Sequence, residues 1–300
     1  MEFLNYDNFL VESFTDNIVE NSFDNMQILE ATKLSSEIND KIKFGIIMAT
    51  HKVADDPGTR SGREKHKPQL ESFKECVEAI KAQKYKNWKL FVCADCYDGD
   101  EELVAILKDT LDKKDYWYYN LPNPGERTNK KILDGGHMHK LAGCKAWNTA
   151  MEQLKKENFK YGVKLGHDDV WTPDHLETHA KAYTQFPESK VVWTKTSKRR
   201  IRGTGLIQWP GSKTRSIDHD SMDFKEGNTA DIYSWEVEPF KGLKWRSVDQ
   251  LTSAPKRKYF IPGDVDMWSR MGEIIKDKEY KTLYVPKITY RYRNNQGKLP

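Results

Sequence analysis

Short apolar runs alternate with amphipathic stretches from residue 42 to residue 195. In the amphipathic stretches apolar residues recur every three or four positions, as Leu70, Phe73, Val77 and Ile80 do, which places them on one face of a helix. The pattern predicts strands at 44–49, 88–94, 116–119, 159–165 and 190–195, and helices at 68–83, 101–111, 139–156 and 173–186. This alternating order predicts an α/β fold in which helices flank a mostly parallel central sheet.

The pattern changes after about residue 196, where Gly, Ser and Lys are frequent and tryptophans stand singly. We therefore expect a first part at 41–195 and a smaller, loop-rich part at 196–300. Residues 1–40 hold nine acids and one lysine. Since the whole chain has a formal charge of +4, this acidic N-terminal extension carries −8 and the remaining 260 residues carry +12. We expect the extension to dock on the basic body of its own chain or of a partner.

The composition describes a very polar chain, with 31% charged and 37% hydrophobic residues and a mean hydropathy of −0.81. No apolar run approaches the roughly 20 residues that cross a bilayer. The first residues lack a basic region followed by an apolar core, so we expect no signal peptide. Four cysteines are too few for a disulfide scaffold at this length, which favours a reducing compartment. We therefore expect a cytoplasmic protein.

The segment 161–176 contains the most informative chemistry. An apolar-leaning run ends at Leu165, and two carboxylates follow at Asp168 and Asp169. Thr172, followed by a proline, is typical of a helix N-cap. Open α/β sheets bind ligands beyond the carboxyl ends of their strands, which is where this acidic pair would lie. Two carboxylates there suit Mg²⁺ or Mn²⁺, with water and a substrate diphosphate as the other ligands.

This segment resembles the diphosphate-metal motif of GT-A glycosyltransferases, which hold the metal of a nucleotide-sugar donor at the end of a sheet strand. Gly166 stands where many relatives carry a leading acid, and His167 occupies the variable middle position. The resemblance implies that Asp169 is a metal ligand. It implies that Asp168 contacts the metal or the ribose.

Two earlier segments carry the same resemblance. Gly45–Lys52 is similar to the opening strand of the family, with His51 in place of the aromatic residue that follows its turn. This implies that His51 lies against a uracil ring and that Thr50 bonds to the nucleoside. Leu90–Asp100 is similar to the second strand and its acid-rich turn, which implies that Asp95 recognises the edge of the pyrimidine.

The downstream half contributes two more matches. Tyr259–Met271 resembles the catalytic-base segment, an acid at a helix start followed by an aromatic residue and an arginine, with Asp264 as the base. A glycine precedes this acid, as in some members of the bacterial spore-coat polysaccharide branch. Ser216–Met222 is similar to the same branch, which implies that Asp218 and His219 contact the donor sugar or the acceptor. The resemblance ends at a Tyr-Arg element, Tyr290–Arg293.

The chemistry of sugar transfer requires groups of these kinds. Loss of a nucleoside diphosphate builds negative charge on the leaving phosphate, which a divalent cation and a lysine such as Lys140 stabilise. Arg127 and Lys145 are further candidates for that role. The acceptor hydroxyl loses its proton to a carboxylate base, Asp264, on the opposite side of the sugar. The resemblance, together with this chemistry, implies an inverting, Mn²⁺- or Mg²⁺-dependent hexosyltransferase of polysaccharide biosynthesis, with a UDP-sugar donor and a saccharide or other hydroxyl acceptor.

Two other functions stay open. The first is a nucleic-acid-binding protein whose basic body binds phosphates, which would make the association salt-sensitive. The sequence contains no recognition fold, so nucleic acid is not the expected partner. The second is an inactive relative that binds nucleotides or saccharides without turnover.

Two further patterns look like metal sites, and we interpret both otherwise. His175 and His179 lie one helical turn apart, but a zinc protease needs glutamate directly after the first histidine, so we interpret the pair as a helix surface. The other pattern is a set of zinc-type ligands whose spacing matches no common zinc module, namely Cys93, Cys96, His137, His139 and Cys144.

Overall fold

The computed structural model describes residues 18–23, 26–52, 69–125, 143–167, 169–197, 232–247 and 263–291. Four predicted site residues lie outside these ranges: Lys140, Asp168, Asp218 and His219. For Asp264 the backbone is described and the side chain is not. No helix in the described ranges is long and apolar enough to cross a membrane.

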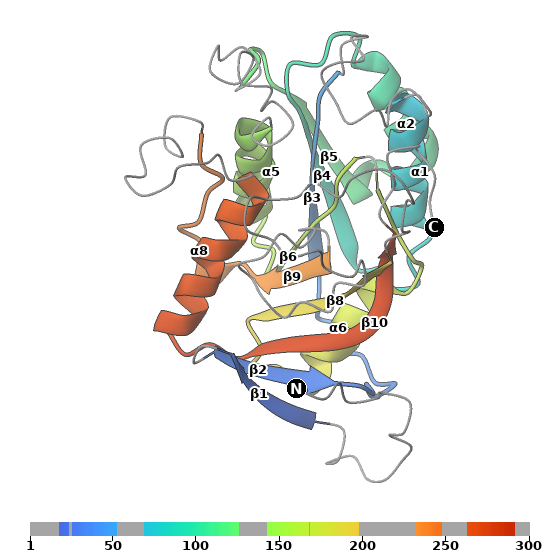
Figure 1. The fold of residues 1–300 in the computed structure, drawn as a ribbon. Coiled ribbons are helices and arrows are strands. Elements are labelled where there is room, and N and C mark those ends of the chain that lie inside the picture. The colour runs from blue at the N-terminus through green and yellow to red at the C-terminus, as the bar shows by residue number, and fades with distance from the viewer. Residues whose placement is uncertain are drawn as a thin grey trace, which may run out of the picture.

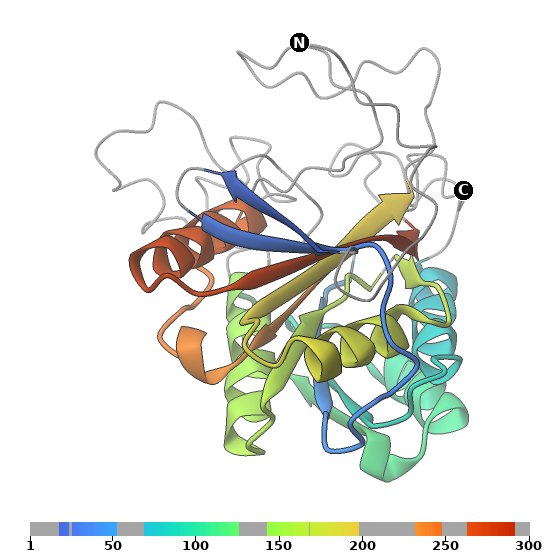
Figure 2. The same ribbon diagram turned by 90° about the horizontal axis from the view of Figure 1, so that it is seen from below.

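The described strands form one mixed sheet, and the helices cover both of its faces (Figures 1 and 2). The strands are β1 (Ile18–Phe23), β2 (Met26–Ala31), β3 (Phe44–Thr50), β4 (Trp88–Ala94), β5 (Tyr116–Asn120), β6 (Tyr161–Lys164), β7 (Val170–Trp171), β8 (Val191–Ser197), β9 (Tyr233–Glu236) and β10 (Thr282–Arg291). The α-helices are α1 (Gln69–Lys81), α2 (Glu101–Thr110), α5 (Cys144–Lys156), α6 (His175–Gln185) and α8 (Gly263–Asp277). Two short 3₁₀ helices lie at Lys113–Asp115 and Glu238–Phe240.

The strand order is β1-β2-β10-β8-β9-β6-β3-β4-β5, and β7 pairs with β10. Strands β6, β3, β4 and β5 run parallel to one another, whereas β9 is antiparallel to both of its neighbours. In Figure 1, α1 and α2 lie on one side of the sheet, and α5 and α8 lie on the other. The predicted α/β class is confirmed.

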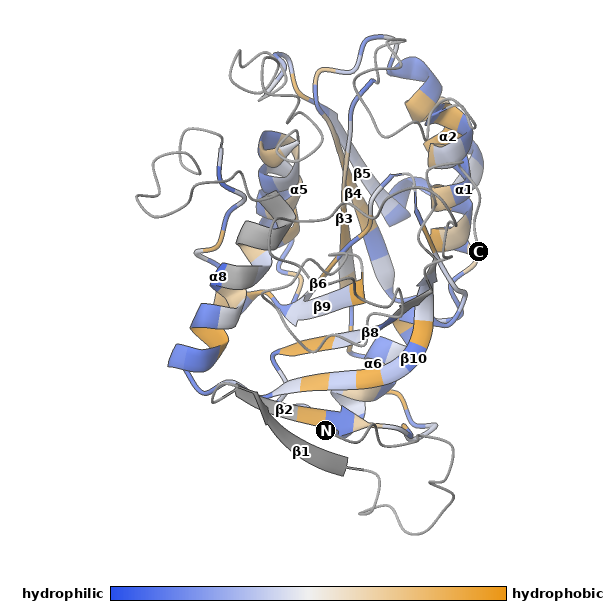
Figure 3. Ribbon diagram, viewed as in Figure 1, coloured by the Kyte–Doolittle hydropathy of each residue, from blue (hydrophilic) through white to orange (hydrophobic). Residues whose placement is uncertain are grey.

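The predicted strands and helices between residues 41 and 195 match the structure within a few residues at each end wherever it is described. Helix α1 shows why the pattern was informative, because its Phe73, Val77 and Ile80 are fully buried against the sheet. Figure 3 shows hydrophobic and hydrophilic residues alternating around α1 and α2. One boundary differs: α6 begins at His175, and the hydroxyl of Thr172 bonds to the carboxylate of Asp174 instead of capping the helix.

The part after residue 196 does not form a separate unit within the described residues, because β9 and β10 lie inside the same sheet. Strand β9 separates β6 from β8. Gly162 in β6 pairs with Trp235 in β9, and a Cβ at Gly162 would lie 2.8 Å from the Trp235 indole. The glycine therefore makes room for a large buried ring at the centre of the sheet.

Strands β1 and β2 come from the stretch predicted as an acidic extension. They form an antiparallel hairpin, and β2 pairs in parallel with β10 through Ile28 to Glu30. Leu29 and Ala31 of β2 are buried. This part of the extension thus belongs to the edge of the sheet rather than to a tail.

The interpretation of His175 and His179 as a helix surface is wrong, because both side chains are fully buried beneath the sheet. His175 Nδ1 lies 2.7 Å from Thr289 Oγ1, and His179 Nδ1 lies 2.6 Å from Ser234 Oγ. Neither Nε2 atom has a hydrogen-bond partner among the described residues. A charged imidazole here would bury an N–H without an acceptor, so both rings are neutral.

This burial makes stability depend on pH. Burial lowers the pKa of His179 to about 3, and burial, with the repulsion that two charged rings would exert on each other, lowers the pKa of His175 well below its usual value. Because the unfolded chain binds protons near pH 6.5 and the folded chain does not, the stabilisation is complete above pH 6.5 and is lost as the pH falls toward 3. At pH 5 keeping His179 neutral in the folded state costs about 2 kcal/mol.

We expect His179→Asn to reduce this acid sensitivity. The amide keeps a polar atom for Ser234 but cannot titrate, so the free energy of unfolding should fall less between pH 7.5 and pH 5 than in the wild type, by about 2 kcal/mol. Urea denaturation at the two pH values measures the difference. An equal loss in both proteins would show that His179 does not titrate on unfolding.

Candidate active site

Three adjacent parallel strands end at one edge of the sheet and bring predicted site residues together. Strand β3 lies between β4 and β6 and is parallel to both. Thr50 ends β3 and His51 follows it, Asp95 follows β4, and Asp169 lies in the connection between β6 and β7. This edge is where open α/β sheets bind their ligands.

Asp95 is fixed in place at the end of β4. Its side chain is fully buried, and its N–H donates to the Thr50 carbonyl at 2.8 Å. Its Oδ1 accepts a hydrogen bond of 2.7 Å from the N–H of Gly125. A Cβ on Gly125 would lie 3.2 Å from both Asp95 Oδ1 and Lys145 Cβ, so the backbone approaches the carboxylate at a position that suits glycine.

Thr50 and His51 are positioned by the start of α1. The Gln69 side-chain amide donates to the His51 carbonyl and lies 3.5 Å from Thr50 Oγ1. The His51 ring meets the His167 ring edge to face, with centroids 5.9 Å apart. His167 Nδ1 donates to the Ala49 carbonyl at 3.3 Å, so the motif after β6 is attached directly to β3.

Asp169 is held by the last strand of the sheet. Its carboxylate is buried with 4% of its surface exposed, and the Tyr290 hydroxyl donates to its Oδ2 at 2.6 Å. The pairing of β7 with β10 sets Tyr290 opposite Trp171, two residues after Asp169. A short hydrogen bond to an ionised carboxylate is strong and directional. Tyr290 therefore orients the carboxylate that the sequence predicts as a metal ligand.

The chemistry at Asp169 fits a hard divalent cation. Mg²⁺ and Mn²⁺ bind through one or two carboxylates, with water and substrate phosphates as the remaining ligands. Tyr290 occupies Oδ2, and carboxylate oxygens have further lone pairs with which to coordinate. Within the described ranges no group of three or more His, Cys, Asp or Glu side chains could hold a metal. A metal at Asp169 would thus depend on Asp168, outside these ranges, or on the substrate itself.

Asp264 lies in the first turn of α8, as the sequence predicts for an acid at a helix start. The positive end of the helix dipole stabilises a carboxylate there. Further along α8, the Trp268 ring stacks on Tyr233 of β9 with centroids 4.8 Å apart. Because β9 pairs with β6, this contact attaches α8 to the strand that precedes Asp168 and Asp169.

The cysteines do not form the alternative zinc site within the described residues. Burial, with a contribution from the Asp95 charge, raises the pKa of the Cys93 thiol to about 12. Among the described residues, no three His, Cys, Asp or Glu side chains come together in a way that could hold a metal. Cys144 is also buried, and His137 and His139 lie outside the described ranges.

Several residues that shape this site were not predicted from the sequence. Gln69 and Gly125 hold the ends of β3 and β4 through contacts across 18 and 30 residues. Neither has a local pattern that marks such a role. Tyr290 did carry a signal, the similarity of Tyr290–Arg293 to a family element, but that similarity does not reveal its contact with Asp169.

The chain is similar in sequence to two known proteins, and it covers almost the whole length of the first. The chain is 24% identical over 263 residues to the uncharacterized glycosyltransferase R139 of Acanthamoeba polyphaga mimivirus, covering 86% of this chain and 97% of the relative. It is 27% identical over 223 residues to the uncharacterized protein y4gI of Sinorhizobium fredii, covering 74% of this chain and 21% of that protein. No protein-family model matches the chain.

Among solved structures, the fold is similar to that of S. aureus TarS 1–349 in complex with UDP. The two superpose with a TM-score of 0.51 at 15% sequence identity, over 83% of this chain. The match spans 60% of the TarS chain. The GT-A-like α/β fold expected from the sequence is confirmed.

Proposed function

We propose that the protein is a glycosyltransferase that moves a sugar from a nucleotide-sugar donor to a hydroxyl acceptor. The observation that carries this proposal is the meeting of Thr50, Asp95 and Asp169 at the carboxyl ends of three adjacent strands. A relative named as a glycosyltransferase, matched over 97% of its length, supports the activity. The fold is shared with a protein solved in complex with UDP, which supports a nucleotide-sugar donor, and we propose that this donor is a UDP-sugar.

In this proposal the ends of β3 and β4 bind the nucleoside. Asp95 is buried, and its Oδ1 is anchored by Gly125, so the carboxylate is held in one orientation to accept an N–H of the base. His51, which is partly exposed, lies beside the base. The Thr50 hydroxyl bonds to the nucleoside, and Lys140 pairs with the diphosphate.

Asp169 would hold Mn²⁺ or Mg²⁺ against the donor diphosphate, and we assign Asp168 to the metal or the ribose. A bound divalent cation there would stabilise the negative charge of the leaving diphosphate. Tyr290 fixes the orientation of Asp169 through its 2.6 Å hydrogen bond. Oriented ligands of this kind reduce the reorganisation that the site undergoes when donor binds.

Transfer follows as a single displacement. Asp264 accepts the proton of the acceptor hydroxyl while that oxygen bonds to the anomeric carbon and the bond from this carbon to the diphosphate breaks. Attack from the side opposite the leaving group inverts the anomeric configuration. Asp218 and His219 contact the donor sugar or the acceptor. We propose that the acceptor is a saccharide, that the reaction serves polysaccharide biosynthesis, and that it takes place in the cytoplasm.

Thermal-shift measurements with UDP-, GDP- and dTDP-sugars, each with and without Mn²⁺, test donor binding. A ligand at about 100 times its dissociation constant stabilises the folded state by about 2.7 kcal/mol, which is roughly 5 °C for a chain of this size. We expect UDP-sugars to give the largest shift, and only when Mn²⁺ is present. The absence of a shift with every nucleotide would favour a nucleic-acid-binding protein instead.

A further inference from the structure

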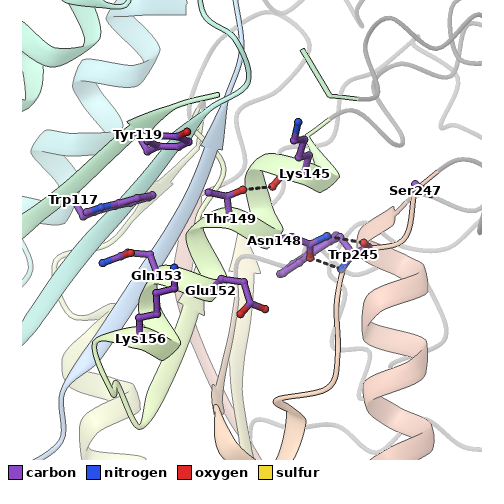
Figure 4. A pocket seen from close by; sticks show the side chains of 10 residues that line it. All are labelled: Trp117, Tyr119, Lys145, Asn148, Thr149, Glu152, Gln153, Lys156, Trp245 and Ser247. Atoms are coloured by element: carbon purple, nitrogen blue, oxygen red, sulfur yellow. Dashed lines mark hydrogen bonds between the residues drawn. The ribbon is translucent and has the colours of Figure 1, made fainter. Parts of the chain in front are cut away.

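A groove of about 580 Å³ runs along α5, beside the candidate active site. Figure 4 shows Trp117 and Tyr119 of β5 on one side of the groove, with α5 facing them. Trp245 lies on the far side of α5. The groove exists because β5 is the edge strand, and α5 packs on β3 and β4 rather than on β5.

The β5 side of the groove is aromatic. Residues two apart on a strand point to the same face, so Trp117 and Tyr119 lie one above the other. Their ring planes differ by 21° and their centroids are 5.9 Å apart. Tyr119 has 42% of its surface exposed, although large aromatic side chains are usually covered. The Trp117 ring is half-buried and packs on Phe91, which fixes the base of the pair.

The α5 side of the groove is polar. Lys145, Thr149, Gln153 and Lys156 recur at helical spacing and therefore form one face of the helix. The two lysines are eleven positions apart, which corresponds to about 16 Å of helix, so the groove has an elongated polar wall. Hydroxyl, amide and ammonium groups on this wall can bond to a ligand that is rich in hydroxyl groups.

On the far side of α5, Trp245 is held rigidly. The Asn148 side chain accepts a hydrogen bond from the backbone N–H of Trp245 at 2.8 Å and donates one to the backbone carbonyl of Trp245 at 2.9 Å. The Trp245 ring stacks on Trp147 with centroids 5.7 Å apart. Because Trp245 is already fixed, a ligand that contacts it loses less entropy on binding.

The charge of the groove favours anionic groups. Among the described residues, its lining holds Lys145, Lys156 and one acid, Glu152. Glu152 itself forms ion pairs of 3.3 Å with Lys155 and 3.6 Å with Lys244. Two cations outside the lining thus pair with this carboxylate, and the described lining holds more cationic than anionic side chains, which favours an anionic ligand.

One end of the groove lies close to the candidate active site. Lys145 lines the groove, and its Cβ lies 3.2 Å from the position that a Cβ on Gly125 would occupy. Gly125 is the residue whose N–H holds Asp95. A chain lying in the groove would therefore end near Gly125 and the carboxylate that it holds. This connects the groove to the place where a nucleotide-sugar is proposed to bind.

We infer that this groove binds an extended saccharide chain, preferentially an acidic one, at a position separate from the reacting sugar. Saccharides present apolar C–H faces and polar hydroxyl edges, which match an aromatic wall opposite a polar one. The inference rests on the proposed function for its choice of saccharide as the ligand. An apolar partner fits less well, because α5 contributes lysine, hydroxyl and amide groups to the lining.

The test is binding of the full chain to immobilised chito-, gluco-, manno- and galacturono-hexasaccharides, followed by calorimetry with the tightest binder. We expect the galacturono-hexasaccharide to bind most tightly. Tyr119→Ala should weaken binding about tenfold, as the loss of an aromatic anchor does, and Tyr119→Phe should retain most of the affinity. Ile288→Ala removes a comparably exposed hydrophobic side chain, 47% exposed on β10, and should have no effect.

Absence of binding to every hexasaccharide, or equal binding by wild type and Tyr119→Ala, would overturn the inference. Tightest binding to a neutral hexasaccharide would overturn the preference for acidic chains. Thermal shifts with UDP-sugar and Mn²⁺ on the same proteins keep the two proposals apart. A thermal shift with nucleotide but no saccharide binding would support the proposed function and contradict the saccharide groove. Saccharide binding without a thermal shift would support the groove and contradict the proposed function.

Discussion

Asp169→Asn should lower the rate of sugar transfer by about 10³-fold, equivalent to about 4 kcal/mol of lost transition-state stabilisation. The substitution removes the negative charge that a divalent cation needs, but an amide oxygen can still accept the hydrogen bond from Tyr290. We therefore expect a folded protein with a melting temperature near that of the wild type. Steady-state turnover of a UDP-sugar across a range of Mn²⁺ concentrations measures the effect.

Tyr290→Phe is the matched variant for this prediction, because it removes only the hydroxyl that orients Asp169. We expect it to raise the Mn²⁺ concentration needed for half-maximal turnover about tenfold, as loss of a ligand-orienting hydrogen bond does, with a smaller effect on the maximal rate. Full activity of Asp169→Asn at ordinary Mn²⁺ concentrations would exclude Asp169 as the metal ligand. An unchanged Mn²⁺ requirement in Tyr290→Phe would limit Tyr290 to a structural role.

Asp264→Asn should lower turnover by about 10²- to 10⁴-fold while donor binding survives, because it removes the proton acceptor without altering the nucleotide end of the site. The thermal shift with UDP-sugar and Mn²⁺ should equal that of the wild type. Asp266→Asn is the matched control, since Asp266 lies two residues later in the same helix. We expect nearly normal turnover in that variant.

A larger loss of turnover in Asp266→Asn than in Asp264→Asn would identify Asp266 as the catalytic base. The stereochemistry of the product gives an independent check on the same step. A single displacement inverts the anomeric centre, which NMR of the new linkage reports. Retention of configuration would require a different mechanism.

The first half of the fold could be predicted because its signals are local. Phe73, Val77 and Ile80 mark the buried face of α1 by spacing alone, and the apolar run from Leu90 to Ala94 marks a strand covered on both faces. The ends of these strands could then be expected to share an edge. This is how the acidic pair that includes Asp169 could be placed at a ligand-binding edge, whereas the choice of Thr50 and Asp95 came from the family resemblance.

The second half could not be predicted in this way because its elements depend on distant partners. Strand β9 is only four residues long and takes its place between β6 and β8 through pairing across about 70 and 40 residues. His175 and His179 on α6 are polar residues, so the sequence predicts that they are exposed to solvent. They are buried because Thr289 and Ser234 supply hydroxyl groups from β10 and β9, which sequence spacing does not reveal.

The release of nucleoside diphosphate from a nucleotide-sugar tests the proposed activity most directly. The full chain is incubated with UDP-, GDP- and dTDP-sugars with and without Mn²⁺, and the free diphosphate is quantified by chromatography. We expect slow, Mn²⁺-dependent release from a UDP-sugar that falls by at least about 10²-fold in Asp264→Asn. No release above the Asp264→Asn background from any of the three donors, by a protein that is folded by circular dichroism, would contradict a glycosyltransferase.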